Sequence, residues 1–297
     1  MTNTNPKRGI YDGVDFEEYL GWDAISQSSL KRMAKSPRHY SRQPDSKESK
    51  ALKIGSLVHC AALEASALHE RYVVMPRYEL EDENVTAAGQ PTTSRATKYY
   101  KKRAEEFKRE NAGREIVSQE EYSKTQAIVY ALQENELARR LLREEGRTEV
   151  SLIWDDPETG LPLKARIDKQ WDGGILDLKT TRSLGDFPKQ AATLHYHVQA
   201  AHYLAGWRAV GDSDIRDAWI LAVESEAPHC AHAATLDAEA LQRGEQLRRR
   251  WLRRVVECSA LRSWPGPELP EVWRLPEWAL MDEEPMVIQF GNETMEV

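Results

Sequence analysis

The sequence lacks any apolar run of about 18 residues, the length that a helix needs to cross a membrane. Its first residues, Met1 to Tyr11, are polar and lack the apolar segment of a signal peptide. Both absences lead us to expect a cytoplasmic protein with no membrane partner. With 297 residues and 40% hydrophobic content, the chain can still bury a sizeable core, and we expect a single domain over residues 1–297 rather than two small ones.

Cysteine is also scarce. The three cysteines, Cys60, Cys230 and Cys258, lie far apart and form no Cys-x-x-Cys pair. This spacing predicts neither a zinc knuckle nor a disulfide framework, and three thiols fall short of the four that an iron–sulfur cluster usually needs. We interpret the cysteines as buried structural thiols.

An excess of positive charge is missing as well, because the net charge is −7. Proteins that bind nucleic acid by broad electrostatic attraction usually carry a basic surface, so this balance argues mildly against such binding. Basic residues nevertheless gather in three stretches, Lys31 to Arg42, Lys98 to Lys108 and Arg243 to Arg254. Either a dipolar protein presents them to DNA, or they are ordinary solvated helix faces.

The periodicity of the apolar residues predicts a mixed α/β fold. After a serine-rich segment that can cap a short basic helix at Leu30, we expect longer helices over 51–63, 96–110, 119–144, 189–210 and 238–258. Alternating runs predict strands over 149–154, 163–169, 175–181 and 218–224. Short turns separate the first three strands, which are therefore expected to form an antiparallel meander.

Side-chain alternation along this meander predicts one core-like face and one polar face, because successive strand residues point to opposite sides. The expected core-like residues are Val150, Leu152, Trp154, Ala165, Ile167, Leu176 and Leu178. The expected polar face carries Glu149, Ser151, Ile153, Lys164, Arg166, Asp168, Asp177, Lys179 and Thr181. The polar face thus gathers two or three carboxylates and a lysine.

Carboxylates that lie close together repel each other, and a divalent cation relieves that repulsion. Oxygen ligands with one imidazole suit Mg²⁺ or Mn²⁺, and the lack of nearby thiolates argues against structural zinc. Asp177 and Lys179 lie on the same side, about 7 Å apart, so the acid could hold a metal while the lysine addresses a phosphate or the attacking water. This pattern is typical of metal-assisted phosphodiester hydrolysis. A salt-bridge ladder of Asp177, Lys179 and Arg166 fits the pattern about equally well.

The sequence also carries seven motifs, in order along nearly the whole chain: Ile25-Ser-Gln-Ser-Ser-Leu30, Gly55-Ser-Leu-Val-His59, Trp154-Asp-Asp-Pro-Glu-Thr-Gly160, Lys164-Ala-Arg-Ile-Asp168-Lys169, Asp177-Leu-Lys-Thr-Thr181, Tyr196-His-Val-Gln199 and Leu275-Pro-Glu-Trp278. In these motifs the chain resembles the nuclease domains of the exodeoxyribonuclease VIII family of prophage recombination exonucleases. That family belongs to the PD-(D/E)XK superfamily and is related more distantly to lambda exonuclease and RecB-type nucleases. The resemblance implies a restriction-endonuclease-like core, in which helices flank a central mixed sheet with an antiparallel meander.

The resemblance also implies roles for individual residues. His59, Asp168 and Asp177 match the metal ligands, with the Leu178 carbonyl as a possible fourth ligand, and Lys179 matches the lysine of the motif. Asp168 follows Arg-Ile rather than the proline of the family pattern, but the carboxylate is retained. Glu149 matches an acidic position and is interpreted as an outer ligand or a partner of the lysine. The implied cofactor is Mg²⁺, for which Mn²⁺ is expected to substitute.

Candidate DNA-binding residues lie on two helices. Gln199 and Tyr203 are one helical turn apart and could lean over the site, although helix packing explains them as well. Ser28, Ser29 and Arg32 could receive a DNA end or its 5′-phosphate at a helix N-terminus, although simple capping explains the serines equally well.

The resemblance implies a metal-dependent exonuclease that degrades linear double-stranded DNA from its ends. It further implies 5′ to 3′ digestion that leaves 3′ single-stranded tails, a homo-oligomeric ring of three or four subunits, and a single-strand annealing protein as partner. A helical segment over about 1–50 is expected where DNA enters, and a Pro/Trp-rich tail over about 262–297. Two alternatives stay open: an endonuclease or single-strand-specific nuclease with the same centre, and a non-catalytic DNA-binding protein.

Overall fold

The computed structural model describes residues 5–42, 49–211, 214–268, 272, 274–275, 287–290 and 293–296. Much of the predicted C-terminal tail, including Pro276, Glu277 and Trp278 of its last motif, lies outside the described residues. All the residues predicted to bind metal or DNA lie inside them.

The predicted meander is confirmed and forms the middle of a seven-stranded sheet. Its strands are β5 (Arg147–Asp155), β6 (Pro162–Trp171) and β7 (Gly174–Thr181), each antiparallel to the one before it. A helical crossover then leads to β8 (Ala218–Glu224), which pairs in parallel with β7. Three short strands that the sequence did not predict complete the mixed sheet: β9 (Ala231–Thr235) beside β8, β1 (Gly9–Tyr11) beside β5, and β2 (Ile25–Ser26) beside the start of β6.

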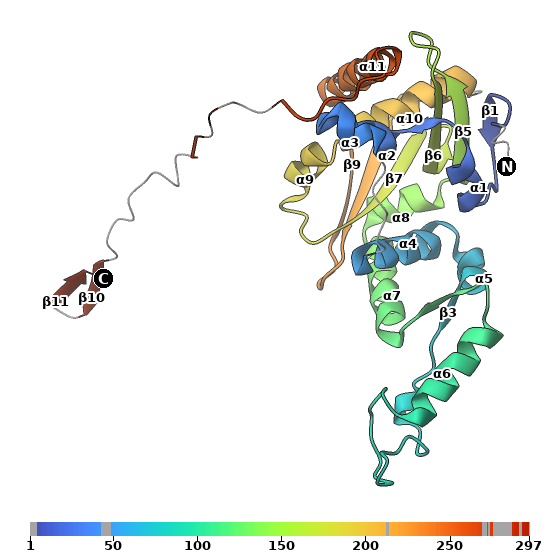
Figure 1. Ribbon diagram of the computed structural model, residues 1–297, viewed down its shortest axis with the longest axis vertical. Helices are drawn as coiled ribbons and strands as arrows, with labels where there is room; N and C mark the ends of the chain where they lie inside the picture. Colours follow the sequence, from blue (N-terminus) through green and yellow to red (C-terminus); the bar gives the residue numbers. More distant parts are fainter. Residues whose placement is uncertain are drawn as a thin grey trace.

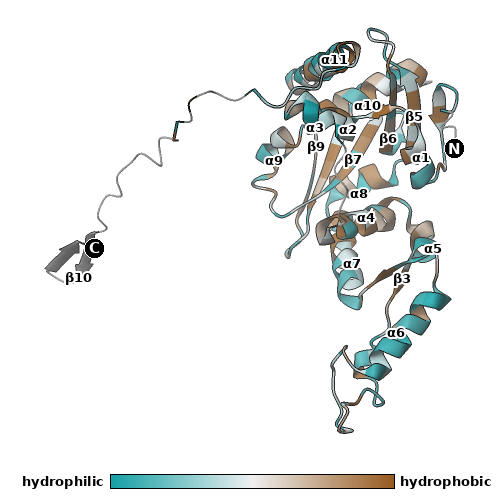
Figure 2. Cartoon of the chain, in the orientation of Figure 1, coloured by the Kyte–Doolittle hydropathy of each residue, from teal (hydrophilic) through white to brown (hydrophobic). Residues whose placement is uncertain are grey.

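Helices cover both faces of this sheet (Figure 1). On one face, α10 (Tyr196–Val210) packs with α11 (Ala238–Ala260). The other face is covered by α4 (Lys50–Leu63), α7 (Gln119–Glu134) and α8 (Glu136–Arg143). Apolar residues, brown in Figure 2, are concentrated on the strands between these two helical layers.

The apolar residues of the meander form two cores rather than the single core-like face expected from their alternation. Five of them pack under α10 and α11, namely Val150, Leu152, Trp154, Ala165 and Ile167, whereas Leu176 and Leu178 pack with α7 and α8. The reason is that β6 and β7 pair only over the three residues next to their hairpin, and then part. Beyond that point the start of β6 pairs with β2 instead. The prediction of one core-like face was therefore wrong.

Two predicted helices are each divided in two. The predicted helix 119–144 divides at Asn135, whose side chain accepts a hydrogen bond from the Ala138 amide at 2.9 Å and so starts α8. The predicted helix 189–210 divides into α9 (Phe187–Thr193) and α10, because His195 has a left-handed backbone with φ of 59°. The predicted helices 51–63, 96–110 and 238–258 agree with α4, α6 (Lys98–Glu110) and α11 to within two residues at each end.

The remaining elements are short. The N-terminal segment contains α1 (Phe16–Gly21), α2 (Gln27–Leu30), the 3-10 turn η1 (Lys31–Ala34) and α3 (Pro37–Ser41). Between α4 and α7 lie η2 (Ala65–Ala67), α5 (Leu68–Arg71), β3 (Tyr72–Val74), η3 (Tyr78–Leu80), α6 and β4 (Glu115–Val117), and β3 pairs in parallel with β4. A separate antiparallel pair is formed by β10 (Val287–Phe290) and β11 (Glu293–Glu296).

Among the described residues, no helix taken singly is long and apolar enough to cross a membrane. The segments Ala51–Leu63 and Ala65–Arg71 meet the length and composition criteria only as a pair, bent by 119°.

His202 is a buried titratable side chain on α10, with none of its surface exposed. Its Nε2 atom lies 3.0 Å from the carbonyl oxygen of Lys164, and its ring lies 4.9 Å from the indole of Trp154. Burial, together with the charge of Arg248, lowers the pKa of His202 to about 4. The neutral imidazole can donate from Nε2, whereas a proton on Nδ1 would find no hydrogen-bond partner among the described residues.

We expect acid to destabilise the fold through His202. In the unfolded chain the pKa of His202 is near 6.5. Between about pH 6.5 and pH 4, His202 is therefore protonated in the unfolded chain but neutral in the folded chain. The free energy of unfolding should therefore fall by about 3 kcal/mol over this window because of His202 alone. Urea denaturation of the wild type and of His202→Gln at pH 7 and pH 4 measures this term; equal pH dependence in the two proteins would contradict it.

Candidate active site

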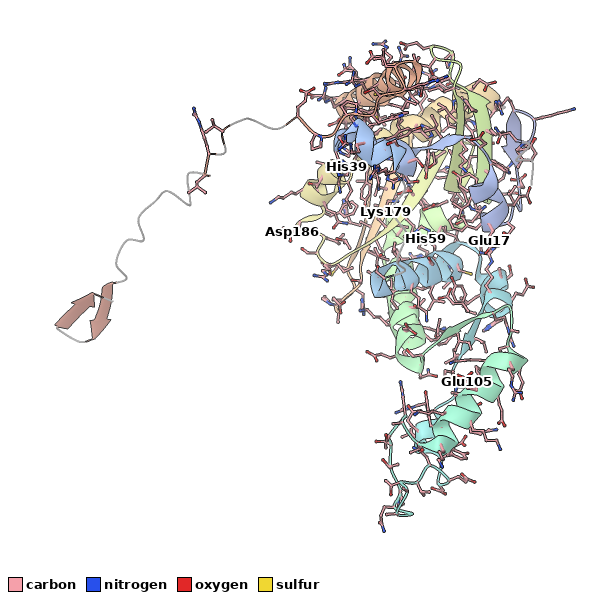
Figure 3. All side chains as sticks on the ribbon, viewed as in Figure 1. Glu17, His39, His59, Glu105, Lys179 and Asp186 are labelled. Atoms are coloured by element: carbon pink, nitrogen blue, oxygen red, sulfur yellow. The ribbon has the colours of Figure 1, made fainter. Side chains whose placement is uncertain are left out.

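The polar residues of the meander meet in a cleft at the point where β6 and β7 part. The cleft has a volume of about 940 Å³ and lies between α1 and α2 on one side and α4 on the other. His59 on α4 and Lys179 on β7 lie close together there (Figure 3). Other lining residues include Ser28, Glu149, Arg166, Asp168, Leu178, Tyr196, Gln199 and Tyr203. The sequence thus brings together side chains from four separate parts of the chain.

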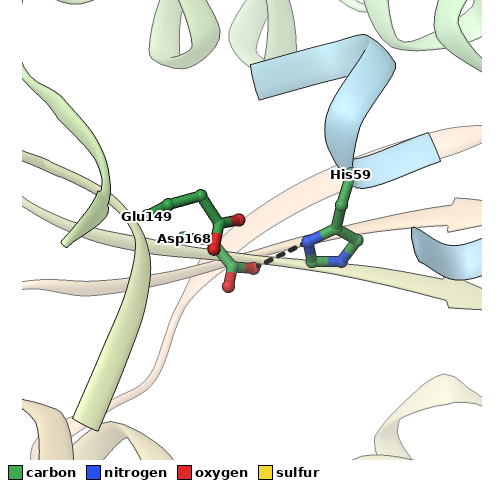
Figure 4. Close-up of side chains that lie close together, drawn as sticks. All are labelled: His59, Glu149 and Asp168. Carbon is green, nitrogen blue, oxygen red and sulfur yellow. Dashed lines mark ion pairs between the residues drawn. The ribbon is translucent and has the colours of Figure 1, made fainter. Parts of the chain in front are cut away.

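Three of these side chains form a group that could hold a metal ion. One ligand atom each of His59, Glu149 and Asp168 lies within 4.8 Å of the other two. Figure 4 shows the imidazole pointing from α4 toward both carboxylates, with Nδ1 of His59 at 3.5 Å from Oδ2 of Asp168. Glu149, which the sequence placed in an outer position, is therefore a member of the central group.

Helix α4 fixes the imidazole from the other side of the cleft. Ser49 caps the helix by accepting a hydrogen bond from the Leu52 amide, and Leu57 and Val58 are fully buried just before His59. The Nε2 atom of His59 lies 2.7 Å from the carbonyl oxygen of Leu178. Because a carbonyl can only accept, the free imidazole donates from Nε2 and turns an unprotonated Nδ1 toward Asp168.

Where β6 and β7 separate, the Asp168 side chain replaces the backbone carbonyl that would otherwise accept a hydrogen bond from β7. Its Oδ2 accepts a hydrogen bond from the Leu178 amide at 2.8 Å. The carboxylate therefore lies between β6 and β7 rather than on one face of a continuous sheet. Asp168 and His59 therefore contact the same residue, Asp168 at the Leu178 amide and His59 at the Leu178 carbonyl.

Glu149 reaches the group through an unusual backbone conformation. Its φ of 52° lies in the left-handed region within a strand, which costs about 1–2 kcal/mol for a residue with a side chain. The side chain is held by Arg166, whose Nε lies 2.6 Å from Oε2 of Glu149. Such an outlier persists only where surrounding contacts determine it, and it is a typical feature of functional sites.

Burial and mutual repulsion disfavour the charged forms of the carboxyl groups in this group. Burial and the nearby Asp177 charge raise the pKa of Asp168 to about 7, and burial and the Asp168 charge raise the pKa of Glu149. Burial lowers the pKa of His59, and the charge of Lys179 lowers it further, so the ring stays neutral and keeps a lone pair. A site with acids that resist ionisation and a neutral imidazole is one that a divalent cation stabilises.

Asp177 and Lys179 form an ion pair beside this group. Oδ1 of Asp177 also accepts a hydrogen bond from Gln199 at 2.8 Å, and Gln199 donates in turn to the Tyr203 hydroxyl at 2.8 Å. Burial alone would lower the pKa of Lys179, but the charges of Asp177 and Asp168 outweigh it and raise that pKa. Lys179 is therefore protonated at neutral pH, and its Nζ lies 5.0 Å from the ring centre of Tyr196.

The structure separates the alternatives that the sequence left open for these side chains. The ladder of Asp177, Lys179 and Arg166 does not form as a unit, because Arg166 pairs with Glu149 while Lys179 pairs with Asp177. Gln199 and Tyr203 do share a face and line the cleft, where Gln199 donates to both Asp177 and the Tyr203 hydroxyl.

The predicted contacts for a DNA end are only partly in the cleft. Ser28 lines it, but the residue that caps α2 is Ser26, which accepts from the Ser29 amide at 3.2 Å. The hydroxyls of Ser28 and Ser29 lie 2.8 and 3.1 Å from that of Ser26. Arg32 instead donates to the Arg42 carbonyl at 3.1 Å. Capping thus accounts for Ser29, and Ser28 is the member of this set that faces the cleft.

Lys164 has a role that the sequence did not predict. Its buried ammonium donates to three carbonyl oxygens of the α1 region, those of Tyr19, Leu20 and Trp22, at 2.8–2.9 Å. Burial lowers its pKa to about 8. The one feature of the sequence that could have indicated this role is that Lys164 lies within a strand predicted to be partly buried. Lys164 thus fastens α1, one wall of the cleft, to the strand that carries Asp168.

The donor set fits a hard divalent cation. Three oxygen donors, from Asp168, Glu149 and the Leu178 carbonyl, surround one imidazole, and Asp177 supplies a further carboxylate beside them. Apart from one residue, the cleft is lined by no cysteine, so it lacks the thiolates that a structural zinc site usually has. 

The single exception is Cys60, which borders the cleft, but its Sγ points to the Glu64 carbonyl at 4.0 Å and burial raises its pKa, so it remains a thiol. The residues present therefore fit Mg²⁺ or Mn²⁺ better than zinc.

Comparisons with known proteins agree with this fold and site. Residues 26–274 match the family described as "PDDEXK-like domain of unknown function (DUF3799)". A comparison with curated protein sequences gives no match. The matched range includes every residue of the cleft that was predicted to bind metal.

One solved structure has a similar fold at low sequence identity. A protein from Eubacterium rectale, described as a "putative exonuclease", is 14% identical, with a TM-score of 0.58 over 90% of this chain and 96% of that one. A second structure, SSO0001, is 15% identical over 68% of this chain and 86% of that one, but its TM-score of 0.27 is too low to support an argument. The predicted restriction-endonuclease-like α/β core is therefore confirmed, and the chain belongs to the PDDEXK-like family DUF3799 within the PD-(D/E)XK nuclease superfamily.

Proposed function

We propose that this protein is a divalent-metal-dependent exodeoxyribonuclease that digests linear double-stranded DNA from its ends. The observation that carries the proposal is the meeting of His59, Glu149 and Asp168 in one open cleft, beside the Asp177–Lys179 pair. Membership of the PDDEXK-like family supports the same chemistry. The rest of the proposal concerns how these side chains act on a phosphodiester.

The proposed cation is Mg²⁺, with Mn²⁺ as a substitute. His59, Glu149, Asp168 and the Leu178 carbonyl would hold it, and Asp177 would offer a further carboxylate beside them. When bound, such an ion neutralises phosphate charge and lowers the pKa of its water, so that hydroxide is available at neutral pH. The site is already arranged for this, because its acids are buried and fixed by hydrogen bonds from Leu178, Gln199 and Arg166.

Lys179 would act as a fixed positive charge on the scissile phosphate. Its raised pKa keeps it protonated, so it cannot serve as a general base at neutral pH. Asp177 holds the ammonium in place, and Gln199, which also donates to Tyr203, holds Asp177. A positioned cation in a partly buried site stabilises the charge that develops on the phosphate oxygens in the transition state.

Finer features of the proposal rest on the resemblance to recombination exonucleases. These are 5′ to 3′ polarity, release of 3′ single-stranded tails, a ring of three or four subunits and an annealing partner. Ring formation would let a chain with a net charge of −7 retain DNA by enclosing it. Light scattering of the purified protein tests the ring, and a mass of one subunit would contradict it.

Replacement of the lysine should stop cleavage but spare DNA binding. Lys179→Ala is expected to lower the rate of digestion of linear duplex DNA by about 10²- to 10³-fold, because one charge that stabilises the transition state is lost. Affinity for DNA, measured in EDTA, should change little. The matched control is Lys189→Ala on α9, which should digest DNA like the wild type. Full activity of Lys179→Ala would overturn the proposed mechanism.

Metal affinity should depend on the carboxylate that lies between the strands. Asp168→Asn is expected to weaken Mn²⁺ binding by more than about tenfold, because a charged oxygen ligand is replaced by a neutral one. Calorimetric titration of Mn²⁺ into each protein measures the change. The exposed Asp186→Asn serves as control, and equal Mn²⁺ affinity in Asp168→Asn and wild type would exclude Asp168 as a ligand.

End dependence is tested with one plasmid in two forms. The linear form, labelled at its ends, should be digested progressively, whereas the covalently closed circle should stay intact under the same Mg²⁺ concentration. Digestion of the closed circle would replace the exonuclease proposal with an endonuclease. Digestion of neither form, with DNA binding retained, would favour a non-catalytic DNA-binding protein.

A further inference from the structure

A second depression lies beside the catalytic cleft, between α11 and the segment that joins η1 to α3. Its volume is about 810 Å³. On α11 its wall is formed by Arg243, Leu247, Arg250 and Arg254, which share one face of the helix at intervals of three or four residues. Lys35 closes it on the η1 side. We call this depression the α11 groove.

The α11 groove is more basic than the chain as a whole. Five basic and two acidic side chains line it, in a chain whose net charge is −7. Arg253 and Arg254 are paired with Glu158 and Glu257. In the part of the chain that the structure describes, no carboxylate forms an ion pair with Lys35, Arg243 or Arg250. Three cations therefore remain available to an anionic ligand.

The α11 groove and the catalytic cleft are lined by neighbouring residues of the same two segments of chain. Residues 26–28 line the cleft and residues 33–37 line the groove, so the short turn between them separates the two. At the start of α10, His195 lines the groove, whereas Tyr196 and Gln199 line the cleft. The segment from Ser28 to Met33 covers five steps along the chain, which span roughly 10 Å in helical geometry.

The groove also has an apolar side. Met33, Leu247 and Trp251 line it together with three prolines, and the ring centre of Trp251 lies 5.2 Å from that of His195. Duplex DNA presents mainly phosphates to such a surface, whereas a single strand presents both phosphates and unstacked bases. Met33 and Trp251 are each 7% exposed and belong to the core, so the apolar surface that a strand can reach is that of Leu247 and the prolines. Such a surface beside unpaired cations suits a single strand, whose bases and phosphates are both accessible.

We propose that the α11 groove binds single-stranded DNA that extends from the catalytic cleft. The inference rests on the proposed nuclease function, because that function makes the neighbouring cleft a DNA site. The arginines of the groove lie outside the catalytic group and contact the strand through its phosphates. The groove thus adds affinity for a strand long enough to occupy both sites.

The test measures binding of fluorescein-labelled oligothymidylates of 4 and 12 nucleotides by anisotropy, in EDTA so that no strand is cleaved. Wild-type affinity should rise strongly between the two lengths. Arg243→Glu/Arg250→Glu should lose most of this rise, with at least a tenfold weaker 12-mer complex. The slope of log K against log salt should fall by about 1.4, because each phosphate contact to a single strand contributes about 0.7.

A matched control separates the groove from the overall charge. Arg140→Glu/Arg143→Glu on α8 makes the same change of net charge away from the groove, and it should bind the 12-mer like the wild type. An equal loss in this control would overturn the inference, and so would an unchanged 12-mer affinity in the groove variant. Arg243→Gln/Arg250→Gln, with a thermal melt like that of the wild type, provides the same test without charge reversal.

Two further results keep this inference separate from the proposed function. A blunt 12-base-pair duplex should lose less than the single strand does in the groove variant, and an equal loss would exclude a single-strand site. If the protein digests no DNA while the groove variant still loses 12-mer affinity, the nuclease proposal fails and the groove is supported. If linear DNA is digested while the groove variant binds the 12-mer normally, the groove inference fails alone.

Discussion

The hydrogen bond from the Leu178 amide to the Asp168 carboxylate is the contact on which the site depends. In a continuous ladder, a backbone carbonyl of β6 would satisfy this amide, and Asp168 would point to one face of the sheet. Because β6 and β7 part beside their hairpin, the side chain spans the opening instead. The same opening leaves the Leu178 carbonyl within 2.7 Å of His59, so one irregularity in strand pairing assembles ligands from a strand, a neighbouring strand and a helix.

Electrostatic strain is the cost of this arrangement. Asp168, Asp177 and Glu149 lie near one another with little access to water, and two of them form ion pairs, Asp177 with Lys179 and Glu149 with Arg166. The left-handed backbone of Glu149 adds a local cost. A folded chain tolerates such a cluster when its cores supply the stability, and here two cores lie on opposite sides of the sheet. The cluster is therefore better explained by binding of a cation than by any contribution to stability.

The sequence predicted the meander, a fourth strand and three of the long helices, because apolar periodicity reports repeated geometry. It did not predict the breaks at Asn135 and His195, which depend on the conformation of single residues. The pattern of alternation brought Asp168 and Asp177 together for a partly wrong reason, since it assumed one continuous polar face. His59 was found only through a family motif, because nothing in the periodicity of its helix relates it to strands more than 100 residues away. The closeness of Glu149 to His59 depends on a backbone angle that no sequence pattern reports.

The three hydrogen bonds from Lys164 to the α1 region have a consequence for how the cleft responds to its contents. Lys164 and Asp168 lie four residues apart on β6, so the wall and the carboxylate are joined by one short, stiff piece of chain. A duplex end that pushes α1 outward would pull on β6 and shift Asp168 relative to His59. Conversely, a cation that draws Asp168 and His59 together would tighten the wall, so that metal loading and the width of the opening are mechanically linked.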